Sequence, residues 1–162
     1  MKQQTRRAAS SGPGTTFGDF VCIVCHNFIS AESALSGVHN RNHCPYCLSS
    51  RHLDMVEAGD RLSACKAAMR PVALTMKKTV KKYVRNGRPG EMMLVHVCDD
   101  CGKISINRIA ADDSISGVLE IFEGSWKLAA NTRLALARSG VMILEAGEQR
   151  LVKERLMGRE GR

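Results

Sequence analysis

Three pairs of cysteines, each with the spacing Cys-x2-Cys, are the residues of this chain best suited to chemistry. Two thiolates two residues apart can hold one metal ion from a single tight turn, and a tetrahedral zinc site takes four such ligands. The pairs are Cys22/Cys25, Cys44/Cys47 and Cys98/Cys101, and a single cysteine, Cys65, lies between the second and third pairs. Seven thiols are one short of two all-cysteine sites, so a histidine is predicted to complete the second.

The first two pairs are predicted to share one zinc ion. Eighteen residues separate Cys25 from Cys44, and Pro45 follows Cys44 directly. Because proline is tolerated in the first turn of a helix, this pair is expected to open one. A knuckle followed by a ligand pair at a helix start is the plan of a treble-clef zinc finger. The four predicted ligands of this ion are Cys22, Cys25, Cys44 and Cys47.

A second zinc ion is predicted at the cysteines that remain, which are Cys65, Cys98 and Cys101. His96 is the first candidate for its fourth ligand, because residues i and i+2 of a strand face the same side and His96 lies two before Cys98. The rival histidines are His52, His43 and His39. The alternative for Cys65 is an ordinary buried thiol. Most sites built mainly of thiolates are structural, so we expect both ions to hold the fold.

Composition indicates one modest domain with an acidic partner. The 162 residues include only four Phe, two Tyr and one Trp, so metal ions can replace part of the missing core volume. The formal net charge is +8, from 24 Lys and Arg against 16 Asp and Glu, and the pI is about 9.4. Such a balance favours phosphate backbones as partners.

The chain carries no recognisable targeting or membrane segment. Residues 1–16 have charge but no apolar stretch of the kind that a secretory signal needs. No stretch approaches the ~18–20 apolar residues of a membrane span. We therefore expect a cytoplasmic protein with no membrane partner and with reduced thiols, and the odd number of cysteines also favours metal over disulfides.

The elements that must position these residues divide the chain into three parts. Residues 1–17 are rich in Lys, Arg, Ser, Gly and Thr, and we expect a disordered basic arm. Residues 18–113 are predicted to form a small α+β zinc-stabilised domain, treble-clef or zinc-ribbon-like, with short strands and hairpins. In residues 114–162 apolar side chains recur at helical spacing behind a possible N-cap, Ser114, which predicts a helical appendage.

A basic segment runs from Arg61 to Gly90, with nine Lys or Arg residues and no acidic one. Its Val and Thr content and the turn residues after Asn86 predict a hairpin over residues 71–97. A helix is the competing interpretation, because apolar residues there also recur at helical spacing. The side chains predicted to bind phosphates from this segment are Lys77, Lys78, Lys81, Lys82, Arg85 and Arg88.

The sequence also resembles a known family. Residues 41–45 read Arg-Asn-His-Cys-Pro, the motif after which the RNHCP domain family is named. Other motifs similar to that family are Phe20-x-Cys22-x2-Cys25, His96-x-Cys98-x2-Cys101-Gly102 and Asn107-Arg108-Ile109-Ala110-x-Asp112-Asp113. The resemblance covers about residues 19–113. It implies a bacterial zinc-finger-like domain, and it leaves the activity to be argued from the residues.

The polar residues of these motifs admit three interpretations. They could cap turns and support the zinc ligands through hydrogen bonds. They could instead form one surface that reads RNA, and the set predicted for that role is Arg41, Asn42, His43, Asn107 and Arg108. Thirdly, His43, Asp112 and Asp113 could form a hydrolytic site.

The sequence therefore predicts a module stabilised by two zinc ions that binds nucleic acid, with RNA or the ribosome ahead of DNA. The basic hairpin and the N-terminal arm would neutralise phosphates with modest sequence preference. One alternative is a protein-interaction adaptor that uses the C-terminal helices. The other is a metal-dependent nuclease or hydrolase. We expect the protein not to be an enzyme, so this alternative comes last.

Overall fold

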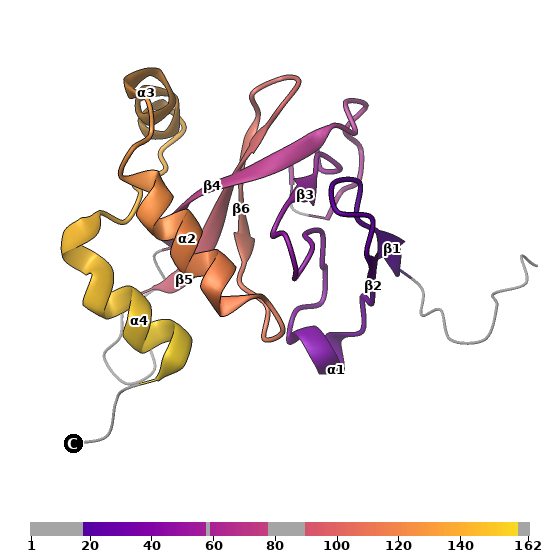
Figure 1. The fold of residues 1–162 in the computed structure, drawn as a ribbon. Helices are drawn as coiled ribbons and strands as arrows, with labels where there is room; N and C mark the ends of the chain where they lie inside the picture. Colours follow the sequence, from indigo (N-terminus) through magenta and orange to yellow (C-terminus); the bar gives the residue numbers. More distant parts are fainter. Residues whose placement is uncertain (1–17, 58, 78–89, 159–162) are drawn as a thin grey trace, which may run out of the picture.

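The structure is a computed structural model, and it describes residues 18–57, 59–77 and 90–158. Strands come first along the chain and most of the helices follow (Figure 1). The strands are β1 (Phe20–Val21), β2 (Phe28–Ile29), β3 (Ser50–Arg51), β4 (Ala68–Lys77), β5 (Glu91–Cys98) and β6 (Ile104–Arg108). The helices are α1 (Ser33–Ser36), α2 (Ile115–Ser125), α3 (Ala130–Arg138), the 3₁₀ helix η2 (Ala146–Glu148) and α4 (Gln149–Met157).

Two antiparallel sheets organise the described residues. β1 pairs with β2, and the larger sheet has the order β3-β4-β5-β6. β4 and β5 run side by side from Met69 opposite Cys98 to Lys77 opposite Glu91. This pairing agrees with the two strands of the hairpin predicted over residues 71–97, whereas residues 78–89, where most of the competing helix was expected, lie outside the described residues.

The C-terminal helices confirm the predicted helical character of that part of the chain, and they pack on the sheet. Alternate residues of a strand face opposite sides, so Leu94 and Val95 of β5 point to different faces. The Leu94 face packs against Val118 and Phe122 of α2 and against α4. The Val95 face packs against Leu136 of α3. Both faces of the central strands are therefore covered by the chain that follows them.

The segment between α3 and η2 covers the free edge of β4. The N–H of Leu144 donates to the carbonyl of Leu74 over 2.8 Å, and the hydroxyl of Thr75 donates to the carbonyl of Met142 over 2.5 Å. Thr75 and Ile143 form an isolated antiparallel bridge. An edge strand with unpaired backbone groups is a template for aggregation, and this segment removes part of that edge.

The helix expected at the second cysteine pair is absent, so this part of the treble-clef prediction is wrong. The residues after Cys44 form a turn, and the chain continues into β3. Leu48, directly after the pair, has a φ of 58°, which ends any right-handed helix. The described fold is a small α+β domain in which all three cysteine pairs stand in turns.

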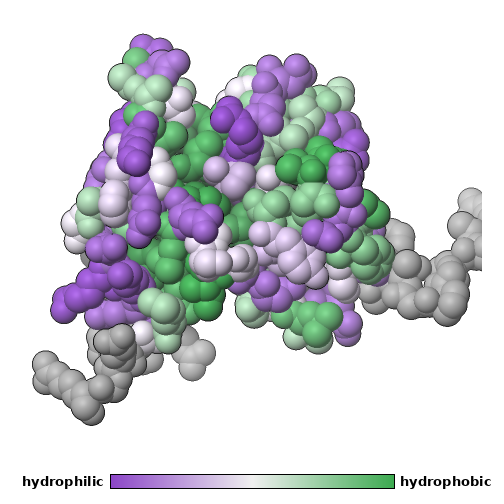
Figure 2. Space-filling model, viewed as in Figure 1, coloured by the Kyte–Doolittle hydropathy of each residue, from purple (hydrophilic) through white to green (hydrophobic). Residues whose placement is uncertain are grey.

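The surface separates by polarity in the view of Figure 2. Hydrophilic side chains cover the outer sides of the C-terminal helices, and hydrophobic ones gather where those helices meet the sheet. Within the described part of the chain, the structure has no helix that is both long and apolar enough to cross a membrane.

Candidate metal centres and the adjacent cavity

The first metal centre gathers the cysteines of the first two pairs, as predicted. The side chains of Cys22, Cys25, Cys44 and Cys47 place their sulfur atoms within 4.8 Å of one another. The Sγ atoms of Cys22 and Cys47 are 3.5 Å apart, and so are those of Cys25 and Cys44. A tetrahedron of sulfurs around zinc, each about 2.3 Å from the ion, has edges of about 3.8 Å. The donor set and its spacing therefore fit a zinc ion.

The three cysteine pairs adopt one backbone geometry. In each, the first cysteine's N–H donates to the carbonyl five residues later, and its carbonyl accepts from the N–H four residues later, over 2.9 to 3.1 Å. The residue after each pair is left-handed, and these residues are His26, Leu48 and Gly102, with φ of 60°, 58° and 70°. This turn points both thiols of a pair to the same side. It explains why a spacing of two residues suffices for two ligands.

The second metal centre joins His52 to the remaining thiols. The group that lies within 4.8 Å comprises His52, Cys65, Cys98 and Cys101. The Nδ1 of His52 is 3.3 Å from the Sγ of Cys101, and the thiols of Cys65 and Cys98 are 3.6 Å apart. Three sulfurs and one imidazole nitrogen are a common zinc donor set. Both clusters could each hold a zinc ion, which agrees with the two ions predicted.

His96 is not part of this centre, and its prediction as the fourth ligand is wrong. Its ring is fully buried, its Nε2 donates to the carbonyl of Leu48 over 2.7 Å, and its Nδ1 accepts from the amide of Asn107 over 2.9 Å. Burial lowers the pKa of His96 to about 4. The imidazole is therefore neutral. Its two hydrogen bonds join β5 to Asn107 of β6 and to Leu48, which follows the turn of Cys44 and Cys47, called the second knuckle below.

The thiols of the first centre differ in how readily they ionise. The backbone N–H of Asn27 is the main cause that lowers the pKa of Cys25 to about 6. Burial raises the pKa of Cys44 and of Cys47. Only thiolates bind zinc strongly, so a bound ion would take the place of the protons on Cys44 and Cys47.

A model of the RNHCP domain family matches residues 17–119, which is more than half of the chain. The chain belongs to the RNHCP domain family. Comparisons with curated proteins and with solved structures give no match. The match includes both metal centres and the Arg41–Pro45 segment, called the RNHCP motif below.

The RNHCP motif anchors a buried ion cluster. Arg41 makes two hydrogen bonds to the carboxylate of Asp112, over 2.7 and 2.6 Å, and a third to Asp113 over 3.3 Å. The Nε2 of His43 donates to Asp113 over 2.8 Å. The side chains of Arg41, Asp113 and His43 are only 1 to 2% exposed. The cluster ties the second knuckle to the turn between β6 and α2.

The charges of this cluster support one another. Burial alone would lower the pKa of Arg41, but the hydrogen bonds and charges of Asp112 and Asp113 outweigh it and raise that pKa. Burial alone would raise the pKa of Asp112, but Arg41 outweighs it and lowers that pKa. Arg41 and Asp112 are therefore ionised near neutral pH. Arg41, His43 and Asp113 are buried and hydrogen-bonded within the cluster, and Asp112, whose side chain is 38% exposed, is held by Arg41. This arrangement favours a structural tie over the hydrolytic site.

The RNA-reading surface predicted from the motif residues does not form as a set. Arg41 and His43 are buried in the ion cluster, so their prediction as nucleic-acid contacts is wrong. Asn107 is bound to His96, and Arg108 is exposed and lies 3.1 Å from Glu91.

The residues predicted on the basic segment fall largely outside the description. Lys77, at the end of β4, is exposed. Outside the described residues lie Lys78, Lys81, Lys82, Arg85 and Arg88.

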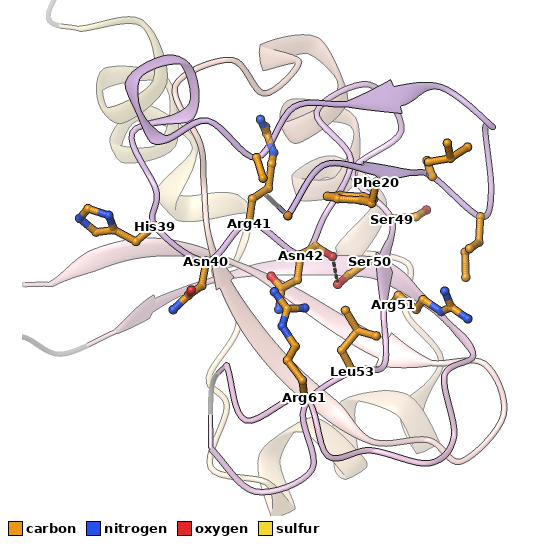
Figure 3. A pocket seen from close by; sticks show the side chains of 15 residues that line it. Phe20, His39, Asn40, Arg41, Asn42, Ser49, Ser50, Arg51, Leu53 and Arg61 are labelled. Carbon is orange, nitrogen blue, oxygen red and sulfur yellow. Dashed lines mark hydrogen bonds between the residues drawn. The ribbon is translucent and has the colours of Figure 1, made fainter. Parts of the chain in front are cut away.

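Asn42 has a different environment from its motif neighbours, because it lines a cavity of about 510 Å³ beside the first metal centre (Figure 3). The cavity lies between β1, the RNHCP motif and the loop that follows β3. Phe20, Arg51 and Arg61 also line it. The sequence gives no periodic or motif signal for this grouping, since three separate segments meet there only after the chain has folded around the metal centre.

Proposed function

We propose that this RNHCP protein is a zinc-stabilised module that binds RNA, mainly through phosphate contacts of its basic segment. The observation that carries the proposal is the run from Arg61 to Gly90, with nine basic residues and no acidic one. Lysine and arginine on such a segment neutralise phosphates and release the counterions condensed on them. The net charge of +8 supports the same class of partner.

The scaffold supports a presented segment of this kind. β4 begins three residues after Cys65, and β5 ends at Cys98, so both strands are tied to the second metal centre at one end. Their last described pair, Lys77 opposite Glu91, stands at the other end. Residues 78–89 thus connect two strands that the core and a metal centre hold in register.

RNA binding is better supported than the adaptor alternative. α2 and α4 bury apolar side chains against the sheet, including Val118, Phe122 and Val152. An adaptor that used these faces for a partner would have to leave the sheet uncovered. RNA is proposed ahead of duplex DNA, and because a two-stranded ribbon such as β4–β5 also fits a DNA major groove, the experiment compares the two nucleic acids directly.

A charge-reversal experiment tests the proposal. The variant changes Lys77, Lys78, Lys81 and Lys82 to Glu, and a control changes Lys127, Arg138, Arg150 and Lys153 to Glu. Each takes the formal net charge from +8 to 0, since four reversals remove two charges apiece. Fluorescence anisotropy with a single-stranded RNA and a duplex DNA is measured over a series of salt concentrations.

The proposal predicts that the segment variant loses RNA affinity at low salt and that its salt slope falls by about 3, because a single strand contributes about 0.7 per phosphate contact. The control keeps most of the affinity. Equal binding by the segment variant and the wild type would contradict the proposal, and so would a clear preference for duplex DNA.

A further inference from the structure

The cavity beside the first metal centre combines three properties that together select a ligand. Its volume is about 510 Å³, within the range of small-molecule and single-nucleotide pockets. The side chains of Asn42, Leu53 and Arg61 point into the same space, and Phe20 bounds it on the opposite side (Figure 3). The walls belong to segments that the first metal centre and the RNHCP motif hold in place.

The first property is charge. The described residues that line the cavity include three arginines and no acidic side chain. Arg41 is neutralised by Asp112 and Asp113, which leaves Arg51 and Arg61. Among the described residues, the guanidinium of Arg51 uses only its Nε, which donates to the carbonyl of Lys66.

Arg61 is 41% exposed and lies 3.9 Å from Asp54. The carboxylate of Asp54 already accepts the backbone N–H groups of Gly59 and Arg61. Both guanidinium groups therefore have donors to offer an anionic group at the rim of the cavity.

The second property is the side chain of Asn42. In the RNHCP motif, Arg41 and His43 serve the ion cluster, Cys44 serves the metal centre, and the carbonyl of Pro45 accepts the N–H of Ser114. No hydrogen bond within the described residues reaches the side-chain amide of Asn42, although its backbone carbonyl accepts from the hydroxyl of Ser50. An amide offers a donor and an acceptor side by side, which is the pattern needed to pair with the edge of a base.

The third property is the apolar wall. Phe20, Val21, Ile23 and Leu53 line the same space as Asn42. Unstacked bases are bound by stacking on aromatic and apolar side chains while their edges are hydrogen-bonded. A flat apolar ring with a polar edge and a linked anion matches all three properties.

We propose that this cavity takes one unstacked nucleotide of a bound single-stranded RNA. Asn42 reads the edge of the base, Phe20 and Leu53 pack on its faces, and Arg51 with Arg61 holds the adjacent phosphate. This inference rests on the proposed RNA binding and adds a base-reading position to it. The basic segment supplies affinity for any RNA, and the cavity supplies preference among bases.

The test measures the affinities of zinc-loaded full-length protein for fluorescein-labelled 12-mers of oligo(A), oligo(U) and oligo(C). The variant is Asn42→Ala, and the matched control is Asn131→Ala, an exposed asparagine of α3. Zinc content and thermal unfolding of both variants establish that they are folded. The wild type is expected to prefer one oligomer. Asn42→Ala should bind that oligomer about tenfold more weakly and bind the others nearly as before.

A second pair of variants tests the phosphate position. Arg51→Ala/Arg61→Ala should lower the salt slope by about 1.4 on every oligomer, at about 0.7 per contact, whereas Arg150→Ala on α4 should not. Asn42→Ala should leave that slope unchanged.

The outcomes separate the two proposals. If the wild type binds RNA but Asn42→Ala matches it on all three oligomers, or is weakened equally on all three, the cavity proposal is overturned and RNA binding stands. If the folded wild type binds none of the oligomers at low salt, the proposed function is overturned and the cavity proposal falls with it.

Discussion

At the scale of single residues, the ion cluster decides how the RNHCP motif is used. Arg41 lies in the interior between Asp112 and Asp113, and His43 donates to Asp113. A buried charge is tolerated only when it is paired and hydrogen-bonded, and here each partner supplies that condition for the others. Two of the motif's three polar residues are therefore structural, which leaves Asn42 free for recognition.

Removing the charge of Asp113 weakens the acceptor that His43 and Arg41 share, while Arg41 keeps its two hydrogen bonds to Asp112. Asp113→Asn is expected to lower the free energy of unfolding by about 1–3 kcal/mol, the usual cost of leaving a buried donor poorly satisfied. Chemical denaturation of the zinc-loaded protein measures this. The control is Glu120→Gln on the exposed side of α2, which should change stability by less than about 0.5 kcal/mol. A loss at Asp113 no larger than that of the control would show that the cluster is not a structural tie.

Residue types and spacing predicted seven of the eight metal-binding residues, and the failure at the eighth has a physical cause. Strand alternation placed His96 on the same side as Cys98. However, Cys98 is the last residue of β5, where the chain turns into the knuckle, so alternation no longer fixes its direction. His52 reaches the centre because its N–H pairs with the carbonyl of Ala67, a contact between segments that spacing does not reveal.

At the scale of elements, the turns of the first two cysteine pairs each hold a residue other than glycine in the left-handed conformation, which costs free energy. The two residues differ in what offsets that cost. His26 and Leu48 both occupy the left-handed position after a cysteine pair. His26 is exposed, whereas Leu48 is 1% exposed and packs in the core beneath α2. Glycine would remove the strain at either position, but at Leu48 it would also remove a core side chain.

The two substitutions should therefore change stability in different directions. Leu48→Gly is expected to lower the free energy of unfolding by about 2 kcal/mol, because the lost burial of a leucine exceeds the strain that is relieved. His26→Gly should leave it unchanged or raise it by up to about 1 kcal/mol. Thermal and chemical unfolding of the two variants gives the comparison. Similar effects at both positions would contradict the role assigned to Leu48.

Elements were predictable where local signals agreed. Ser114 caps α2 by accepting the N–H of Gly117, as the sequence pattern predicted. The helix expected after Cys44 failed because proline signals only that a first turn is permitted. Pairing of β3 with β4 and the left-handed Leu48 take the chain into the sheet instead.

At the scale of the whole molecule, the helices and the metal-bearing part share one core. Leu48 of the second knuckle and Leu74 and Leu94 of the sheet belong to the same cluster as Phe122 of α2. The helices therefore complete the core of the part that carries the metals. This arrangement bears directly on any attempt to shorten the protein.

A chain that ends at residue 113 should not fold cooperatively, because it exposes the apolar face of the sheet that α2 and α4 cover. Thermal unfolding followed by circular dichroism, together with binding of a hydrophobic dye, measures this. A chain that ends at Gly158 keeps all of the described elements and serves as the control. A cooperative transition in the shorter chain would contradict the shared core.

The central claim is that two zinc ions hold the module and that His52 completes the second centre. Native mass spectrometry counts the ions per chain after dialysis against a chelator too weak to strip the wild type. The wild type should keep two ions, His52→Ala should keep one, and His96→Gln should keep two. One ion on the wild type, or loss of an ion from His96→Gln but not from His52→Ala, would contradict the account.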